Sequence, residues 1–191
     1  MTSDETRELL ERWGALLTGH FVLSSGRHSD TYIEKFRALE HPKVAWELGS
    51  ELARLFSDTA IDVVLAPAVG AVILGFTTAA ALGTRSIFTE RVEGAMTLRR
   101  GFEILPGERV LVVEDVVTTG KSLMEVVRLV PGDQLAGIGC LADRSGGIEL
   151  PLPLRALTNI EAVSWLPDEC PLCAQGVPLT DRGSRRLGAP R

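Results

Sequence analysis

Two adjacent acidic residues, Glu114 and Asp115, precede a short segment rich in hydroxyl groups, with two apolar residues in between. That segment reads Thr-Thr-Gly-Lys-Ser over residues 118–122. Hydroxyls and free backbone N–H groups next to a glycine suit a phosphate group, because glycine lets the backbone come close to the anion. Carboxylates repel phosphate but accept hydrogen bonds from sugar hydroxyls. The combination predicts binding of a sugar phosphate, although an ordinary strand, turn and capped helix would also fit the spacing.

The elements around this segment predict where it lies in the fold. The apolar run Val110–Val113 is typical of a buried strand, and a helix is expected over 121–130. In open α/β sheets, ligands bind beyond the carboxyl ends of the strands, which is where the acidic pair is expected. The glycine spacing differs from that of a Walker A loop, so a nucleotide site of that kind is excluded.

Strand and helix patterns alternate along the middle of the chain. Short apolar runs predict strands at 61–65, 85–89, 109–113 and 134–142, and helical spacing predicts helices at 4–17 and 43–56. A small-residue helix is expected after Ala71 up to about Leu82, and another helix over 121–130. This alternation is typical of an α/β fold with a doubly wound parallel sheet flanked by helices. We divide the chain into an N-terminal helix and small hood (1–40), an α/β core (41–166) and a C-terminal tail with a C-x-x-C pair (167–191), whose end, 181–191, is expected to fray.

Composition and charge narrow the function classes. The chain has 191 residues, of which 45% are hydrophobic and 24% charged, as in ordinary globular proteins. Its formal net charge of -5 argues against broad binding to nucleic acid or anionic membranes. No apolar run approaches the roughly 20 residues that cross a bilayer, and the polar start lacks a secretory signal. We expect a cytoplasmic protein with no nucleic-acid or membrane partner.

Residues 110–122 resemble the phosphoribosyl-pyrophosphate signature of the type I phosphoribosyltransferases. In that signature an apolar strand, two acidic residues, two apolar residues and a Thr/Gly-rich turn follow one another. The resemblance covers about residues 15–145 and implies the fold of that family. It implies that Glu114 and Asp115 hold the ribose diol, and that the 5-phosphate is held by Thr118, Thr119, Gly120, Lys121 and Ser122.

Other segments resemble the orotate phosphoribosyltransferases. Residues 19–32 match a Ser-Gly-basic-x-Ser-x-x-Tyr pattern found in their hood, although a polar hairpin with a buried Tyr32 would look the same. The resemblance implies conversion of orotate and 5-phosphoribosyl 1-pyrophosphate to orotidine 5-monophosphate and pyrophosphate, in de novo pyrimidine (UMP) biosynthesis. It implies substrate contacts from Arg27 and His28, base contacts from Arg144 and Thr118, and pyrophosphate contacts from Val69 and Gly70.

Residues 90–101 occupy the position of that family's mobile catalytic loop. Arg91 keeps a basic position at its start, but Gly94 and Met96 stand where a lysine and a histidine are expected. Arg99 and Arg100 are candidate catalytic replacements beside Arg91, and the solvated face of a hairpin is an equally good interpretation. The resemblance further implies a homodimer in which this loop reaches the neighbouring subunit's site. It also implies Mg²⁺ held through the substrate, with Asp115 as a catalytic residue and the one candidate protein ligand.

The cysteines and histidines carry a weaker signal. Three cysteines do not make a disulfide framework, and Cys170 and Cys173 alone supply half of a four-ligand zinc site. A plain turn with reduced cysteines is the leading interpretation, ahead of zinc shared across a dimer and of a redox pair. The histidines, His20, His28 and His41, are scattered along the sequence and indicate no metal cluster.

Two other functions fit part of the pattern. One is a purine phosphoribosyltransferase of the adenine or xanthine type, which the missing loop lysine and histidine leave open. The other is a regulator that keeps the fold to sense the donor and binds nucleic acid. The acidic net charge argues against the regulator. Turnover with a panel of bases would separate the three.

Overall fold

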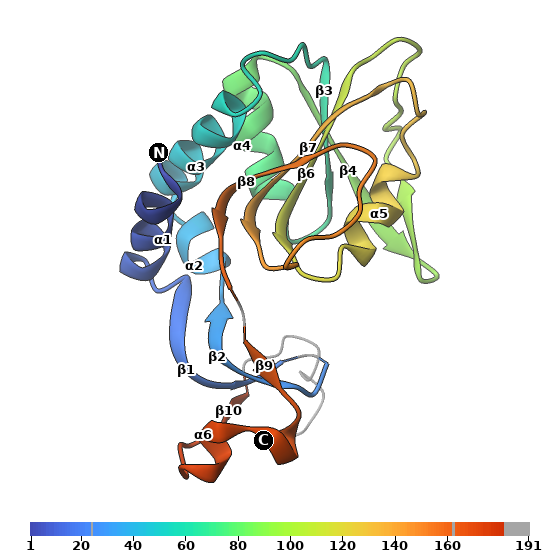
Figure 1. The fold of residues 1–191 in the computed structure, drawn as a ribbon. Helices are drawn as coiled ribbons and strands as arrows, with labels where there is room; N and C mark the ends of the chain where they lie inside the picture. Colours follow the sequence, from blue (N-terminus) through green and yellow to red (C-terminus); the bar gives the residue numbers. More distant parts are fainter. Residues whose placement is uncertain (24, 162, 182–191) are drawn as a thin grey trace.

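A six-stranded sheet forms the centre of the computed structural model, which describes residues 1–23, 25–161 and 163–181. Its strands lie in the order β5-β4-β3-β6-β7-β8 (Figure 1). All neighbours in this sheet run parallel except β5, which pairs antiparallel with β4 at the edge. The strands are β3 (Val63–Pro67), β4 (Arg85–Val92), β5 (Ala95–Leu98), β6 (Val110–Val117), β7 (Leu135–Asp143) and β8 (Leu154–Asn159).

Helices cover both faces of this sheet. One face carries α1 (Ser3–Arg12), α2 (Phe36–Leu39), α3 (Pro42–Arg54) and α4 (Val72–Leu82), and the other carries α5 (Lys121–Val127) (Figure 1). Side chains of β6 alternate between the two faces, as the period of two requires. Leu111 and Val113 pack with α3 and α4, whereas Val110 and Val112 pack with α5. The doubly wound α/β sheet predicted from the sequence is confirmed.

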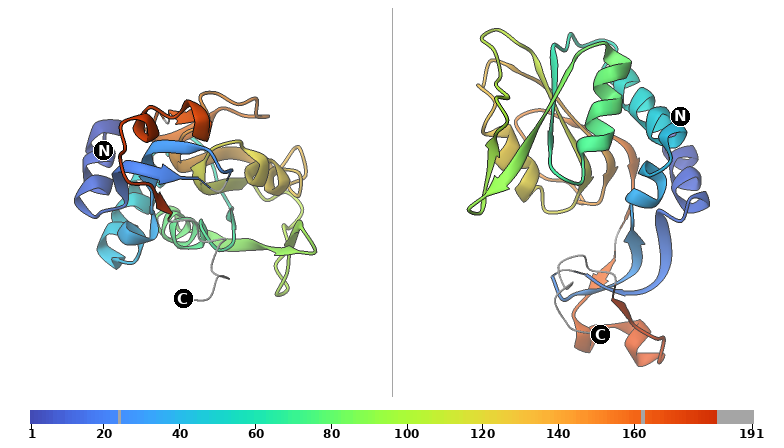
Figure 2. Two further views of the ribbon diagram at one scale, coloured as in Figure 1. Left: turned by 90° about the horizontal axis from the view of Figure 1, so that it is seen from below. Right: turned by 180° about the vertical axis from the view of Figure 1, so that it is seen from behind.

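A second, small sheet combines residues 16–33 with residues 164–181. Its order is β10-β1-β2-β9, and it lies below the main sheet as the hood (Figure 2). A hairpin of β1 (Leu16–Val22) and β2 (His28–Ile33) forms its centre. The C-terminal segment then adds β9 (Ser164–Trp165), a 3-10 turn (Pro167–Glu169), α6 (Pro171–Ala174) and β10 (Thr180–Asp181). The tail expected at 167–191 is therefore part of the hood as far as residue 181, and residues 182–191, expected to fray, lie outside the described residues.

Several element boundaries differ from the sequence-based prediction. The first helix ends at Arg12 rather than at residue 17, because Gly14 adopts a φ of 65° and turns the chain into β1. The acidic pair lies inside β6, which continues to Val117 instead of ending at Val113. Strand β8, at the edge of the sheet, was not predicted at all. In the described part of the chain, no helix is long and apolar enough to span a membrane.

Candidate active site

The acidic pair lies at the carboxyl end of the central strand. Glu114 and Asp115 are buried, with 7% and 6% of their surface exposed. Asp115 forms an ion pair with Lys35, whose Nζ lies 2.7 Å from Oδ2 of Asp115. Lys35 comes from the segment between β2 and α2, about 80 residues away along the chain. Lys35 carries no signal in the sequence, because a lysine between two short elements belongs to no motif.

Burial and charge set the protonation of these groups. Burial acts to lower the pKa of Lys35, but the adjacent carboxylate of Asp115 outweighs it and the pKa is raised. Burial, followed by the charge of Asp115, raises the pKa of Glu114 to about 9. The ligand-free site therefore holds Lys35 as a cation and Glu114 as a neutral acid near neutral pH. Two such neighbours can both donate hydrogen bonds to ligand oxygens.

The loop after β3 packs directly against the acidic pair. A Cβ atom added to Gly70 would lie 2.2 Å from Oδ2 of Asp115 and 3.3 Å from Nζ of Lys35. Only glycine fits at this position, because any side chain would collide with the ion pair. Val69 projects outward with 75% of its surface exposed, and the Ala68–Val69 peptide bond is cis. The structure thus brings the predicted pyrophosphate loop and the predicted ribose acids together.

The turn between β6 and α5 encloses a polar cavity of about 150 Å³. Gly120 has a φ of 68°, and a Cβ atom there would lie 2.5 Å from Cδ1 of Ile148, so glycine is required on two counts. The cavity is of a size that suits a phosphate group. Its lining runs without a break from Glu114 to Leu123 and includes the predicted phosphate ligands Thr118, Thr119, Gly120, Lys121 and Ser122.

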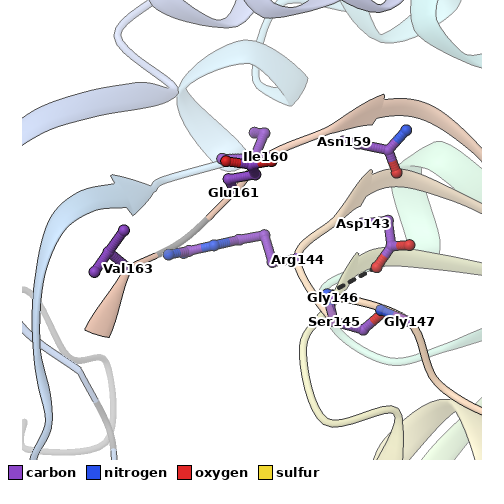
Figure 3. Close-up of a pocket in the computed structure, with 9 residues that line it drawn as sticks. All are labelled: Asp143, Arg144, Ser145, Gly146, Gly147, Asn159, Ile160, Glu161 and Val163. Atoms are coloured by element: carbon purple, nitrogen blue, oxygen red, sulfur yellow. Dashed lines mark hydrogen bonds between the residues drawn. The ribbon is translucent and has the colours of Figure 1, made fainter. Parts of the chain in front are cut away.

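A larger cavity of about 470 Å³ opens beside this turn, at the ends of β7 and β8 (Figure 3). The two cavities adjoin, since the backbone N–H of Arg144 donates to the carbonyl of Val117 at 2.8 Å. The side chain of Arg144 extends across the larger cavity towards Val163 (Figure 3). Its Nη2 donates to the carbonyl of Thr31 at 3.4 Å, but its Nε is buried with no hydrogen-bond partner among the described residues. Burial lowers the pKa of Arg144, yet a guanidinium stays charged in proteins.

The segment 90–101 contains a β-hairpin, formed by the end of β4 and by β5, which ends at Leu98. Strands β4 and β5 meet at Glu93 and Gly94, whose φ angles of 49° and 88° fit a two-residue turn of type I′. Gly94, which stands where the family's lysine is expected, is therefore a turn residue. Met96 packs into the core with only 9% of its surface exposed, so it takes no part in solvent-facing chemistry.

The three hairpin arginines are held by carboxylates. Arg91 forms an ion pair with Glu125 of α5 at 2.8 Å, which ties the hairpin to the helix that follows the phosphate turn. Arg100 pairs with Glu90 at 2.7 Å, and Arg99 approaches the same carboxylate at 3.9 Å. In a single chain the structure does not bring these arginines to the lining of either cavity described above.

The predicted substrate-contact residues Arg27 and His28 lie in the hood, Arg27 directly before β2 and His28 at its start. The Nε of Arg27 donates to Oγ of Ser164 at 2.9 Å, which fastens β2 to β9. The imidazole of His28 is buried and faces His20 and Cys173. The expectation that the histidines are scattered is wrong for His20 and His28. The β1–β2 hairpin places their rings together, and the sequence spacing does not reveal this.

The sheet carries a buried acidic pair, a phosphate-sized cavity that requires a glycine, and a larger cavity at its strand ends. Together these features are typical of α/β proteins that bind sugar phosphates beyond the carboxyl ends of their strands. The model of the phosphoribosyl transferase domain matches residues 38–166. The orotate phosphoribosyltransferase of Pelotomaculum thermopropionicum is 48% identical over 190 residues, which are 98% of this chain and 100% of that relative. The chain belongs to the phosphoribosyltransferase family and falls among its orotate phosphoribosyltransferases.

Solved structures agree with this assignment. The Mycobacterium tuberculosis orotate phosphoribosyltransferase, solved in complex with Fe(III) dicitrate, is 30% identical, with a TM-score of 0.67 over 82% of this chain and 95% of that one. An adenine phosphoribosyltransferase from Trypanosoma brucei has a TM-score of 0.58 at 17% identity over 79% of each chain, which is a likeness of fold alone. The fold is thus common to enzymes for different bases, and base choice depends on the cavity residues.

Proposed function

We propose that this chain transfers the phosphoribosyl group of 5-phosphoribosyl 1-pyrophosphate to orotate, giving orotidine 5-monophosphate and pyrophosphate in de novo pyrimidine (UMP) biosynthesis. The observation that carries the choice of base is the guanidinium of Arg144. It is partly buried at a cavity of about 470 Å³, and its Nε has no partner among the described residues. An unpaired buried donor of this kind favours an anionic ligand, because leaving it unpaired costs free energy. Orotate supplies a carboxylate, whereas adenine supplies none.

The donor would lie across the two adjoining cavities. The 5-phosphate fits the turn formed by residues 118–122, and the ribose diol fits the acidic pair of β6. The pyrophosphate would then lie against the loop at Val69 and Gly70, where the Lys35 ammonium is close enough to offset its charge. In this arrangement the anomeric carbon would lie between the leaving pyrophosphate and the base cavity, as an in-line displacement requires.

The oxygen atoms that meet at this site are compatible with binding of Mg²⁺. Carboxylate, hydroxyl and pyrophosphate oxygens are the ligands that this hard cation prefers. Asp115 is the protein residue that would hold it, while most ligands would come from the substrate. When bound, Mg²⁺ would neutralise charge on the pyrophosphate as that group leaves.

The residues of the chain supply the rest of the catalysis. As the bond to pyrophosphate breaks, positive charge grows on the ribose and negative charge on the leaving group. The carboxylate of Asp115 stabilises the first and the cation of Lys35 the second. We propose that the arginines of the β4–β5 hairpin add to this in a homodimer, where the hairpin of one subunit reaches the site of the other. Its closure would also exclude water and so protect the donor from hydrolysis.

Turnover with a panel of bases tests the proposal. Purified protein is incubated with the donor and Mg²⁺ together with orotate, uracil, adenine, guanine or xanthine, and nucleotide and pyrophosphate are both measured. Orotate is expected to react at least tenfold faster than any other base. Faster turnover of adenine or xanthine would establish a purine enzyme instead. Donor binding without turnover of any base would favour the regulator, and nucleic-acid binding would then be measured.

We also propose a cytoplasmic location. The support is the set of cysteines, all three of which are free thiols in the structure, as is usual in a reducing compartment. Fractionation of cells that express the full chain, with a periplasmic marker as the control, tests this location.

A further inference from the structure

Four metal-binding side chains converge in the hood, away from the two cavities described above. His20 lies on β1, His28 on β2, Cys170 directly before α6 and Cys173 within α6. One ligand atom from each of the four lies within 4.8 Å of every other. Three of the residues are buried, and Cys173 is exposed at the surface. Two pairs of residues about 150 positions apart in the sequence thus meet at one point.

Four of the six distances among these atoms are close to the edges of a tetrahedron around one small cation. For zinc, bond lengths of about 2.05 Å to nitrogen and about 2.3 Å to sulfur give edges of about 3.3 Å between two nitrogens and about 3.6 Å between nitrogen and sulfur. The nitrogens of His20 and His28 are 3.1 Å apart. The nitrogen–sulfur distances are 3.4 Å and 3.7 Å from His20 Nε2 to Cys170 and Cys173, and 3.3 Å from His28 Nδ1 to Cys173.

The hydrogen bond of the outer nitrogen fixes the tautomer of His20. Its Nδ1 lies 2.8 Å from the carbonyl oxygen of Val177, and a carbonyl can only accept. Nδ1 therefore carries the proton, and Nε2 directs its lone pair into the cluster. Such a carbonyl partner is what metal-binding histidines ordinarily have. One lone pair cannot accept hydrogen bonds from three neighbours at once, whereas a single cation at the centre satisfies all four groups.

We propose that His20, His28, Cys170 and Cys173 bind one zinc ion that fastens the C-terminal segment to the hood. Two histidines and two cysteines form a closed four-ligand set, the kind that zinc occupies in structural sites. On binding, the two thiols release their protons to solvent, and the resulting thiolates balance the two charges of the ion. The metal would stabilise the attachment of the C-terminal segment, because β9 and β10 are only two residues long and each pairs with the hairpin over two positions.

The site requires one chain, not two. From the sequence alone, zinc shared across a dimer is an alternative, since Cys170 and Cys173 supply only half of a ligand set. The second half comes from the hairpin of the same chain. A redox role for the cysteine pair would leave the inward-facing nitrogens of His20 and His28 unexplained.

Metal analysis of the full, untagged chain tests the proposal. The protein is purified without chelators and its metals are measured by mass spectrometry, with thiols counted in parallel. We expect about one zinc per chain in the wild type. Cys173→Ser and His20→Gln should each lower zinc content at least tenfold, because loss of even an outer partner costs 10–100-fold in affinity. Cys140→Ala and His41→Gln are the matched controls, since neither residue belongs to the cluster, and should keep the metal.

Cobalt substitution gives a second measurement that does not depend on the variants folding. Metal-free wild type titrated with Co²⁺ should develop the visible bands of four-coordinate cobalt and a thiolate-to-cobalt band in the near ultraviolet. A chelator should also lower the melting temperature of the wild type and of the two control variants. Wild-type protein with neither zinc nor the cobalt spectrum would overturn the proposal. A Cys170–Cys173 disulfide in the freshly purified protein would overturn it in favour of a redox pair.

Discussion

Asp115 is the residue on which binding of 5-phosphoribosyl 1-pyrophosphate, the donor, is expected to depend most. It pairs with Lys35 at 2.7 Å and touches the glycine loop that faces it. Asp115→Asn should raise the KM for the donor at least tenfold and lower kcat, since a charge-assisted hydrogen bond is worth about 1.5–3 kcal/mol. Steady-state kinetics and donor titration measure this. Asp62→Asn, which affects an aspartate paired with Arg109 outside the site, is the control and should change neither constant. Unchanged donor affinity in Asp115→Asn would refute the assignment of the acidic pair.

Arg144 is the residue that should decide the affinity for the base. Arg144→Ala is expected to raise the KM for orotate at least tenfold while leaving the donor KM within about twofold, because a paired guanidinium contributes about 1.5–3 kcal/mol. The exposed Arg128, which follows α5, provides the control variant Arg128→Ala. Kinetics with each substrate varied in turn separate the two constants. Equal loss of affinity for both substrates would show that Arg144 only supports the fold of the site.

Glu114 should make the ligand-free protein less stable as the pH rises. Its pKa is raised from 4.5 in the unfolded chain to about 9 in the fold, so between these values the folded state holds a proton that the unfolded state has lost. The free energy of unfolding therefore falls with rising pH across this window. Each pKa unit of difference is worth about 1.4 kcal/mol. Urea denaturation at pH 5 and pH 8 should show a smaller loss of stability in Glu114→Gln than in the wild type. An identical pH dependence in both proteins would argue against a neutral Glu114.

At the scale of elements, the sequence predicts what is local and apolar. Apolar residues in the sequence identify the strands of the sheet and the helices that pack on it, because each of these elements buries a continuous apolar surface. This holds for β3, β6, β7, α3 and α4. The motif of residues 114–122 locates the phosphate turn for the same reason: its residues are consecutive. Lys35 and the cluster at His20 could not be found in this way. Their partners lie far along the chain, and tertiary contacts alone bring them together.

The β4–β5 hairpin is the element in which the expected loop lysine and histidine are replaced. Arg91→Ala, Arg99→Ala and Arg100→Ala are each expected to lower kcat more than they raise KM, because the charge that they stabilise develops only in the transition state. Arg85→Ala is the matched control, since Arg85 lies on the same β4 but pairs with Glu108 instead. Rapid-quench and steady-state rates measure the effect. If all three variants keep the wild-type kcat, the hairpin arginines are surface charges held by Glu90 and Glu125 and nothing more.

At the scale of the whole molecule, residues 16–33 and residues 164–181 meet in the hood. The N-terminal hairpin supplies its centre, and the C-terminal segment adds a strand on each side. The hood also contributes to the site, since the segment after β2 carries Lys35 and the carbonyl of Thr31 contacts Arg144. The hood therefore contributes one residue to the acidic pair and one contact to the base cavity.

A last prediction concerns the assembly. In one chain the hairpin arginines reach neither cavity, so a catalytic role for them requires a second subunit. We expect mixtures of Asp115→Asn with Arg99→Ala or Arg100→Ala to recover activity from two weak parents, because a mixed dimer contains one site with both an intact acidic pair and an intact hairpin. With random exchange of subunits, about one quarter of the wild-type activity is the most that can return, since half of the dimers are mixed and each has one complete site. Turnover is measured against the mixing ratio after subunit exchange, with sedimentation to establish the dimer.

A mixture of Asp115→Asn with Glu114→Gln is the control, because both changes damage the same site and no dimer of these two contains an undamaged acidic pair. Activity that stays at the average of the two parents would show that each hairpin serves its own subunit or none.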